Sequence, residues 1–358
     1  MSSETIRSLR LLVVMPSWVG DAVMATPALR LVRRSLPGIF IGALVRPGID
    51  EVLAGSDFFD EVHVARPTGI MGPKFAAAKI RPRRYDTALL LTNSFSSALI
   101  VRIAGIARRI GYDRDARGLL LTDRLEAPKT AGGRWAPVPA VEYYLRLACE
   151  AMLEVSVPAW RQGAAPMELG VTDEQRAAGA ALLERAGIGA GDRFAVLNPG
   201  GNNEAKRWPP ERFAALAEWL ASEHAMRVVI NGSPGEAELV GRIAAAAPGA
   251  RSAELPKLGI TLGALKEVVR RAALMVTNDT GPRHLAAAFG VPLVSLFGPT
   301  DHRWTTIPTR PGAPEEILLA DPTLPEGEVA DDHPERCRVD RITVEQVRGA
   351  VERVLAPV

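Results

Sequence analysis

The sequence predicts an α/β protein made of two doubly wound domains, each built on a parallel β-sheet. Short apolar runs alternate with longer segments of helical periodicity, which is the pattern of repeated strand–helix–strand units. The alternation loosens between Leu125 and Pro166 and then restarts, and 358 residues exceed one compact core of ordinary size. We therefore expect one domain over residues 1–165, a second over 166–340 and a closing helix over 341–358, with a ligand-binding cleft between the domains.

The elements of the first half are expected in alternating order. Leu11–Met15 has the continuous apolar character of a buried parallel strand, residues 16–21 read as a loop, and a helix follows over Ala22–Ser35. Three further strands are predicted at Phe40–Val45, Glu61–Ala65 and Thr87–Thr92, with helical candidates between them. A single helix, Val141–Leu153, lies in the looser region.

The second half repeats this pattern. Strands are predicted at Phe194–Asn198, Arg227–Asn231, Leu274–Thr277 and Pro292–Phe297, and helices at Pro210–Ser222, Glu236–Ala246, Thr261–Ala272 and Gly281–Phe289. Residues 308–334, rich in proline, glycine and acidic side chains, are expected to form a surface loop. Thr343–Leu355 is expected to be an amphipathic helix with Thr343 as its cap.

Composition excludes several classes of protein. The chain is 47% apolar and 23% charged, which describes a soluble globular protein, and its 43 basic and 41 acidic residues provide no global attraction to nucleic acid. The clusters Arg81-Pro-Arg83-Arg84 and Arg108-Arg109 could meet an acidic partner, although solvated faces are the favoured interpretation.

The sequence also predicts a cytoplasmic protein without structural metal. Cys149 and Cys337 lie far apart with no ligand spacing, which argues against a zinc site or a disulfide framework and fits a reducing compartment. The N-terminal residues lack the layout of a signal peptide, and polar residues break the most apolar stretch, Ala88–Ile106.

The segment Leu274–Ala288 is the most informative part of the chain. An apolar strand ends in Asn278-Asp279, and Thr280-Gly281 opens an alanine-rich helix directly after it. A helix N-terminus has unpaired N–H groups and a positive dipole end that attract phosphate. Asp279 and His284 offer side chains beside such a site. Taken alone, an ordinary capped helix explains the segment at least as well.

Gly20-Asp21 follows the first strand, at the sheet edge where open α/β folds bind ligands. A carboxylate there can take a proton from a substrate hydroxyl, whereas position alone favours Asp21 as a cap of the next helix. Neither the G-x-G-x-x-G fingerprint nor a P-loop motif occurs, which weakens the dehydrogenase and P-loop interpretations.

Two segments of the second half provide charged side chains. In Pro199–Pro209 a glycine-rich turn gives access to the backbone, and Lys206 or Arg207 could neutralise a phosphate; a flexible loop with a solvated basic pair explains it equally well. Glu236 could hold a ribose, or could simply favour the start of a helix.

For two further turns, a contact to a ligand and a purely structural role are both possible interpretations. The short polar residues Asn93 and Ser94 follow a predicted strand and could contact a polyhydroxylated acceptor, although an N-capping role is favoured for each. Gly298 ends another strand and could line a phosphate site through its backbone, or form a simple turn.

In chain order, these motifs resemble the glycosyltransferase family 9 heptosyltransferases over nearly the whole sequence. The resemblance rests on Pro-Ser-Trp-Val-Gly-Asp21, Asn93-Ser-Phe, Ala-Lys206-Arg-Trp-Pro, Val-Thr-Asn-Asp279-Thr-Gly with His284, and Phe-Gly-Pro-Thr300. The first two are more similar to the heptosyltransferase II branch than to heptosyltransferase I.

The resemblance implies a GT-B fold, with an acceptor-binding N-terminal domain and a donor-binding C-terminal domain. It implies transfer from ADP-L-glycero-D-manno-heptose to the lipopolysaccharide inner core, with inversion, no cofactor and no essential metal. It leaves room for peripheral contact with the inner membrane and implies no nucleic-acid partner. Another nucleotide-sugar transferase of the same fold, or a nucleotide-sugar-binding protein without catalysis, are the alternatives.

The resemblance also implies roles for individual residues. Asp21 matches the catalytic base, and Lys206 matches the lysine beside the donor phosphate and the developing charge. Asp279 matches a contact to the transferred sugar, and Thr280-Gly281 match the diphosphate cradle. The remaining positions expected near the donor are Gly20, Glu236, His284 and Gly298, and those expected near the acceptor are Ser17, Asn93 and Ser94. Pro282-Arg283 departs from the family's smaller or apolar residues.

Overall fold

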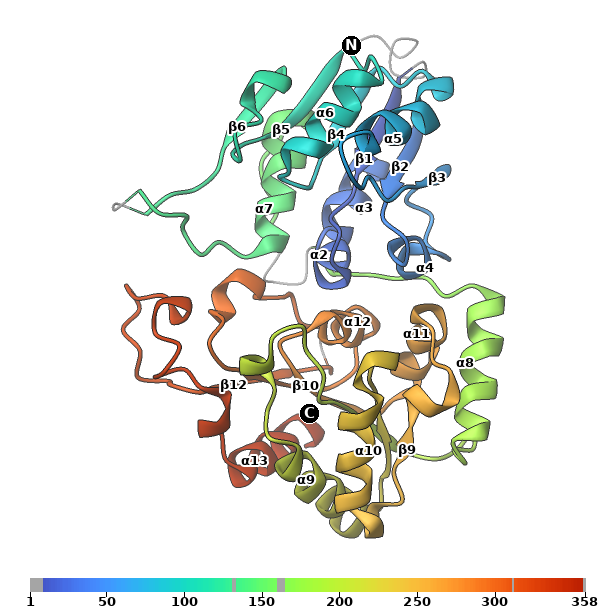
Figure 1. Cartoon of the computed structure of the whole chain (residues 1–358), viewed down its shortest axis with the longest axis vertical. Coiled ribbons are helices and arrows are strands. Elements are labelled where there is room, and N and C mark those ends of the chain that lie inside the picture. The colour runs from blue at the N-terminus through green and yellow to red at the C-terminus, as the bar shows by residue number, and fades with distance from the viewer. Residues whose placement is uncertain (1–8, 131–132, 160–164, 311, 357–358) are drawn as a thin grey trace. The chain divides into compact units, whose positions relative to one another are not determined.

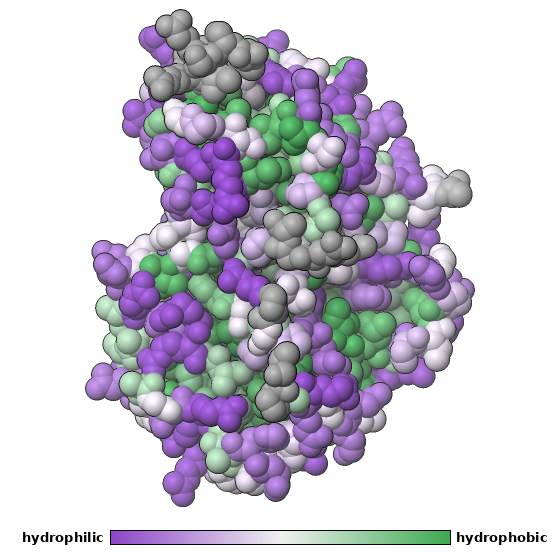
Figure 2. All heavy atoms as spheres, turned by 180° about the vertical axis from the view of Figure 1, so that it is seen from behind, coloured by the Kyte–Doolittle hydropathy of each residue, from purple (hydrophilic) through white to green (hydrophobic). Residues whose placement is uncertain are grey.

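The computed structural model describes residues 9–130, 133–159, 165–310 and 312–356. The chain divides into two compact units, Met1–Gly170 and Val171–Val358, and each is described by itself (Figure 1). On the face drawn in Figure 2, hydrophilic and hydrophobic residues are interspersed, as on most folded proteins.

The first unit contains a six-stranded parallel sheet in the order β3-β2-β1-β4-β5-β6. Its central strands are apolar and buried, because helices cover both faces of a parallel sheet. The strands are β1 (Arg10–Val14), β2 (Phe40–Val45), β3 (Glu61–Val64), β4 (Thr87–Leu90), β5 (Arg108–Asp113) and β6 (Asp123–Glu126).

The helices of the first unit differ from the prediction at one functional position. The helices are α2 (Val19–Met24), α3 (Thr26–Ser35), α4 (Ile49–Leu53), α5 (Gly72–Ile80), α6 (Phe95–Ile103), α7 (Ala140–Arg146) and the π-helix η3 (Leu147–Leu153). The single helix predicted from Ala22 is wrong, since helix begins at Val19 and a new helix starts at Thr26, one residue before Pro27. Gly20 and Asp21 therefore lie in the first turn of α2, not in a loop.

The second unit has the same topology. Its six-stranded parallel sheet has the order β12-β11-β10-β7-β8-β9. The strands are β7 (Phe194–Asn198), β8 (Arg227–Ile230), β9 (Ala253–Glu254), β10 (Leu274–Asn278), β11 (Leu293–Phe297) and β12 (Glu315–Leu319). The prediction of residues 308–334 as loop alone is wrong, because β12 lies within them and pairs with β11 as the edge strand.

The helices of the second unit are α8 (Asp173–Arg185), α9 (Pro210–Glu223), α10 (Ala237–Ala246), α11 (Leu262–Arg271), α12 (Gly281–Phe289) and α13 (Val344–Leu355). Thr343 caps α13 as predicted, with Gln346 completing a capping box. The short helical turns of the chain are η1 (Arg81–Arg83), η2 (Gly118–Leu120), η5 (Glu204–Lys206), η6 (Pro234–Glu236), η7 (Pro248–Ala250), η8 (Leu255–Leu258), η9 (His302–Thr305), η10 (Ala330–Asp332) and η11 (Val339–Arg341).

The strand order indicates where each sheet is expected to bind its ligand. In each unit the chain moves outward from its first strand over two strands, and then returns to pair its fourth strand with the first. Ligands of open α/β sheets bind at the carboxyl ends of the strands at this switch point. The switch points lie between β1 and β4 and between β7 and β10. Most of the predicted motifs follow these four strands, whereas Glu236 follows β8 and Gly298 follows β11.

Candidate functional site

In the first unit, Asp21 is held by a tyrosine from a distant part of the sequence. The residue before α2, Trp18, caps the helix without a side-chain hydrogen bond, and Asp21 Oδ1 accepts a hydrogen bond of 2.9 Å from the Tyr144 hydroxyl. The interpretation of Asp21 as a helix cap is therefore wrong. Burial and the charge of Asp21 raise the pKa of Tyr144 well above its ordinary value, so this hydroxyl stays protonated and donating.

The predicted acceptor residues at the end of β4 are tied into the unit. The Ser94 hydroxyl accepts from the Ser97 N–H at 3.2 Å, so the N-capping interpretation of Ser94 is confirmed. Asn93 Oδ1 accepts from Arg117 at 3.0 Å and from the Tyr143 hydroxyl at 3.2 Å. Ser17 lies in the turn between β1 and α2.

Arg117, which carried no signal in the sequence, is fully buried beside this turn. It donates to the carbonyls of Thr92 and Tyr112 as well as to Asn93. Burial lowers the pKa of Arg117 to about 10, which leaves it charged at neutral pH. The guanidinium thus joins the carboxyl ends of β4 and β5 and sets the orientation of the Asn93 amide.

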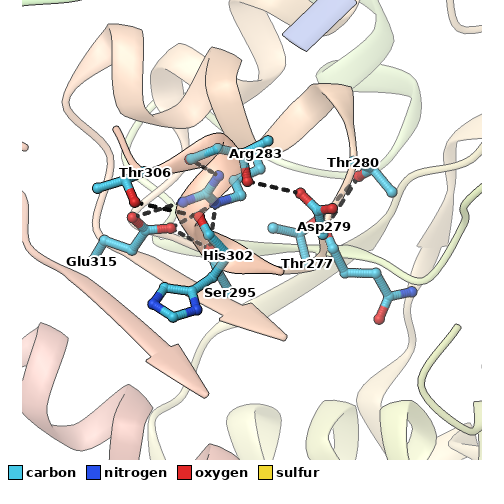
Figure 3. Close-up of polar contacts among 10 residues, drawn as sticks. Thr277, Asp279, Thr280, Arg283, Ser295, His302, Thr306 and Glu315 are labelled. Carbon is cyan, nitrogen blue, oxygen red and sulfur yellow. Dashed lines mark hydrogen bonds and ion pairs between the residues drawn. The ribbon is translucent and has the colours of Figure 1, made fainter. Parts of the chain in front are cut away.

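In the second unit, the structure brings two predicted site residues into contact. Lys206 in η5 follows β7, Asp279 follows β10, and Lys206 Nζ lies 3.1 Å from Asp279 Oδ2. The Thr305 hydroxyl donates to Asp279 Oδ1 at 3.4 Å, and Figure 3 shows Asp279 among its polar neighbours. The family resemblance implied a phosphate contact for Lys206 and a sugar contact for Asp279 without pairing the two residues. Their pairing places both at one end of the sheet.

A row of buried amides crosses the same strand ends. Asn231 donates to Asn198 Oδ1 at 2.6 Å, and Asn198 donates to the hydroxyls of Thr277 and Thr280 at 3.0 and 2.8 Å. Asn278 donates to the carbonyls of the glycine-rich turn, at 2.8 Å to Pro199 and 3.2 Å to Gly200. These contacts hold the turn against β10, and no role was predicted for Asn198, Asn231 or Asn278.

The N-terminus of α12 offers backbone N–H groups to an anion, but fewer of them than a helix N-terminus ordinarily provides. Thr280 is the N-cap residue without a capping side-chain bond, Pro282 has no N–H, and the Arg283 N–H donates to the Thr280 carbonyl at 3.2 Å. Among the described residues, none accepts a hydrogen bond from the N–H groups of Thr280 and Gly281. These two donors are the ones available to an anion.

Glu236 closes the glycine-rich turn from the other side. Its Oε1 accepts from the Gly201 N–H at 2.9 Å, and its Oε2 accepts from the N–H and hydroxyl of Ser233, both at 2.8 Å, in a capping box. Burial opposes ionisation, but the hydrogen bonds from Ser233 and Gly201 hold the pKa of Glu236 below its ordinary value. A Cβ on Gly200 would lie 2.3 Å from Oε1, so this approach requires glycine.

Two predicted donor residues have structural roles in the fold. His284 is buried, and burial together with the charge of Arg283 lowers the pKa of His284 well below its ordinary value. It is neutral, so it cannot attract a diphosphate by charge. Gly298 packs against the segment that leads into α13, where a Cβ would lie 2.8 Å from Val339 Cβ. This close contact explains the glycine without a ligand.

Arg283, the departure from the family pattern, anchors α12. Its fully buried guanidinium pairs with Glu315 of β12 at 2.7 and 3.0 Å, and donates to the Thr305 carbonyl at 2.8 Å and to Ser295 at 3.0 Å (Figure 3). The same turn supplies the Thr305 hydroxyl to Asp279. Arg283 therefore links the site to the edge of the sheet.

Other predicted features can be placed in the described parts of the chain. No group of three histidine, cysteine or acidic side chains is arranged there to hold a metal, and both cysteines are buried and free. No helix in those parts is long and apolar enough to cross a membrane. Arg108 pairs with Asp123 and Arg109 donates to backbone carbonyls, so this basic pair is satisfied within its own unit.

Comparison with known proteins identifies the family. Residues 76–320 match the model of glycosyltransferase family 9 (heptosyltransferase). The chain is 30% identical over 305 residues to lipopolysaccharide heptosyltransferase 2 of Escherichia coli K12, covering 83% of this chain and 85% of that protein. It is 29% identical over 311 residues to lipooligosaccharide heptosyltransferase 2 of Haemophilus influenzae, covering 83% and 85%.

Solved structures agree with these matches. The chain is similar to E. coli ADP-heptose lipopolysaccharide heptosyltransferase II, with a TM-score of 0.77, 25% identity and coverage of 97% and 98%. It also resembles a family 9 glycosyltransferase from Veillonella parvula, with a TM-score of 0.80, 19% identity and coverage of 97% of each chain. The predicted GT-B class of two Rossmann-like α/β units is confirmed, and the chain belongs to glycosyltransferase family 9, the heptosyltransferases.

Proposed function

We propose that this glycosyltransferase moves heptose from ADP-L-glycero-D-manno-heptose to the lipopolysaccharide inner core, with inversion at the anomeric carbon. The relatives that match over most of the chain carry names for this activity. The single observation that best supports a donor site is the contact between Lys206 and Asp279 beside the open N-terminus of α12. A cation, a sugar-binding carboxylate and free N–H groups meet there, as a nucleotide diphosphate-sugar requires.

The first unit supplies the base in this proposal. Asp21 accepts the proton of the acceptor hydroxyl as its oxygen bonds to the anomeric carbon of the donor. The bond from that carbon to the diphosphate oxygen breaks on the opposite side, and its electron pair leaves with ADP. Tyr144 holds the Asp21 carboxylate in place through the hydrogen bond to Oδ1. Asn93 and Ser17, near the ends of β4 and β1, are proposed to contact the acceptor.

The second unit receives the leaving group. The Lys206 ammonium has three N–H donors, so it can keep Asp279 while binding a diphosphate oxygen. Together with the N–H groups of Thr280 and Gly281, it stabilises the negative charge that grows on ADP, typically by a few kcal/mol for each preorganised donor. No metal is required in this scheme. Asp279 is proposed to accept from a hydroxyl of the transferred sugar, and Glu236 from the ribose.

Location follows from the acceptor. A lipopolysaccharide core precursor is anchored in the inner membrane, so the protein is proposed to work in the cytoplasm and to contact the membrane surface peripherally. Nucleic acid is not a proposed partner, since the net charge is only +2.

The decisive test is release of ADP when the purified protein is mixed with ADP-heptose and a heptose-deficient core acceptor. Turnover should persist in EDTA, and Asp21→Asn should lower it by roughly 10²–10⁴-fold while leaving ADP binding intact. Binding of ADP-heptose without turnover would support the nucleotide-sugar-binding alternative. Turnover with a different nucleotide sugar only would show that the donor is not ADP-heptose. Normal turnover by Asp21→Asn would show that Asp21 is not the base.

Hydrogen exchange tests which unit binds the donor. ADP should protect the backbone amides of 199–209 and 279–284, because both segments border the Lys206–Asp279 contact. Protection limited to the first unit would reverse the donor and acceptor assignment.

A further inference from the structure

The helix α5 and the turn before it present an exposed apolar face in the first unit. Met71, Lys74, Phe75, Ala78 and Lys79 are all exposed, and their spacing of three and four residues places them on one side of the helix. Phe75 is 66% exposed and Met71 49%, and Ile70 in the preceding turn is 99% exposed. The opposite side of α5, with Ala76, Ala77 and Ile80, is buried in the core.

The turn that carries Ile70 is packed against the helix. The Gly72 N–H donates to the Gly69 carbonyl at 3.2 Å, and a Cβ on Gly72 would lie 2.6 Å from the Pro67 backbone. The Phe75 N–H donates to the Met71 carbonyl at 3.2 Å, which sets these two side chains one helical turn apart. Three large apolar side chains are therefore held at the surface within six residues.

The segment that carries this apolar face contains basic residues but no acidic residue. Residues 66–84 contain six basic residues and no acidic residue, and all six basic side chains are exposed: Arg66, Lys74, Lys79, Arg81, Arg83 and Arg84. Only Arg83 forms an ion pair among them in the described structure, with Glu61 at 2.6 Å. Lys79 and Arg81 donate to the carbonyls of Val64 and Ile103, contacts that leave their positive charge uncompensated.

We propose that this surface, formed by Ile70, Met71 and Phe75 with the basic residues of 66–84, docks the first unit on an anionic lipid bilayer. A bilayer interface accepts apolar side chains into its outer acyl region and attracts lysine and arginine to its headgroups. A folded acidic protein would need, besides its charge, a preformed apolar pocket for Ile70, Met71 and Phe75, whereas a bilayer accepts them without one. The inference deepens the proposed function and rests on it, because a membrane-anchored acceptor is the reason for the protein to bind a bilayer. The binding itself is argued from the exposed side chains alone.

The test is co-sedimentation of the purified protein with vesicles. Vesicles of phosphatidylcholine and phosphatidylglycerol in equal parts should bind the protein at low salt, while vesicles of phosphatidylcholine alone should bind little. Lys74→Glu with Arg84→Glu should lower the partition coefficient by at least about 25-fold, since each basic residue that is lost near such a surface contributes about fivefold and each glutamate adds repulsion. Ile70→Ser with Phe75→Ser should lower it by at least about tenfold.

Matched controls separate this surface from general effects. Leu119→Ser removes another apolar side chain that is 93% exposed, and Arg34→Glu with Arg193→Glu reverses two exposed charges elsewhere; both should bind vesicles nearly as wild type does. Turnover with a water-soluble, deacylated acceptor should be unchanged in the Lys74 and Arg84 variant. If the wild-type protein shows no turnover at all, the proposed function is contradicted. Vesicle binding can still be measured, so the two proposals fail separately.

Three outcomes would overturn the inference. These are wild-type protein that does not bind anionic vesicles, surface variants that bind as wild type does, and equal losses in the control variants. A dimer in solution that Ile70→Ser with Phe75→Ser dissociates would assign the surface to a second copy of the chain instead.

Discussion

At the residue scale, the contact between Lys206 and Asp279 is the feature most directly open to test. The Asp279 side chain is buried, so its charge needs a partner, and Lys206 provides it. In the proposed complex, a diphosphate oxygen shares the same ammonium, which has three N–H donors. The pair therefore links donor binding to the position of Asp279, the carboxylate that we propose to bind the sugar.

Lys206→Ala should weaken ADP binding and slow transfer together, because the phosphate charge is present in the ground state and grows in the transition state. Lys206→Arg should restore only part of both, since a planar guanidinium differs from a point charge. Asp279→Asn should bind ADP at least as tightly as wild type, because it removes a negative charge near the diphosphate, yet transfer slowly. Calorimetry and initial rates measure these effects; unchanged affinity and rate in Lys206→Ala would reduce the lysine to a loop residue.

Tyr144→Phe should move the acidic limb of the pH–rate profile to higher pH by about one unit, because a hydrogen bond to the charged carboxylate of Asp21 is lost. The KM for the donor should hardly change, since Tyr144 belongs to the first unit. Tyr143→Phe is the matched control, as its hydroxyl contacts Asn93 instead. A uniform loss of rate with no shift of the limb would indicate a purely structural tyrosine.

At the element scale, the position of α12 depends on one buried ion pair. Arg283 and Glu315 are at most 4% exposed, and they join α12 to the edge strand β12. Arg283→Met should lower the free energy of unfolding of the second unit by about 3–5 kcal/mol, because it leaves Glu315 buried without its partner. Adding Glu315→Gln should recover part of this loss. Urea denaturation measures both effects.

The neighbouring residue provides the control for this prediction. Glu316 pairs with Arg353 at 2.9 Å, but Arg353 is 56% exposed. Arg353→Met should therefore cost less than about 1 kcal/mol, as exposed ion pairs do. Equal losses in the two variants would show that burial does not set the strength of the Arg283 pair.

At the scale of the whole molecule, stability should fall as the pH drops below about 6.5. Burial lowers the folded-state pKa of His63 in the first unit and of His284 in the second below the value of 6.5 that the unfolded chain has. Below that pH the unfolded chain binds protons that the folded chain does not, so the stability present at neutral pH is lost, by up to about 1.4 kcal/mol per pH unit for each histidine.

Denaturation between about pH 7.5 and about pH 5.5 measures this slope. His284→Gln should reduce it for the second unit, where His302, whose pKa burial also lowers, keeps a part of the slope. By contrast, His224→Gln, at a half-buried position on the surface of that unit, should leave the slope as it is. A slope unchanged by His284→Gln would mean that other groups cause the acid sensitivity.

The sequence by itself determined the fold class and the family. Buried parallel strands such as β7 and β10 are continuous apolar runs, and α12 and α13 have local periodicity and caps, so their boundaries follow from neighbouring residues. Most site motifs could be found because they follow β1 and β4 in the first unit and β7 and β10 in the second, which are neighbouring strands in each sheet. Polar strands at or near sheet edges, such as β5, β6 and β12, lack this apolar signal and were missed.

Only the tertiary structure decided how the site residues are held. Tyr144 reaches Asp21 across 123 positions, and Arg283 reaches Glu315 across 32. Nothing near either residue in the sequence specifies such a partner, because the contact depends on which helices and strands pack together. The burial that makes His284 neutral is likewise a property of the packed unit. Local patterns specify elements and their order, whereas charge, orientation and protonation at the site follow from long-range packing.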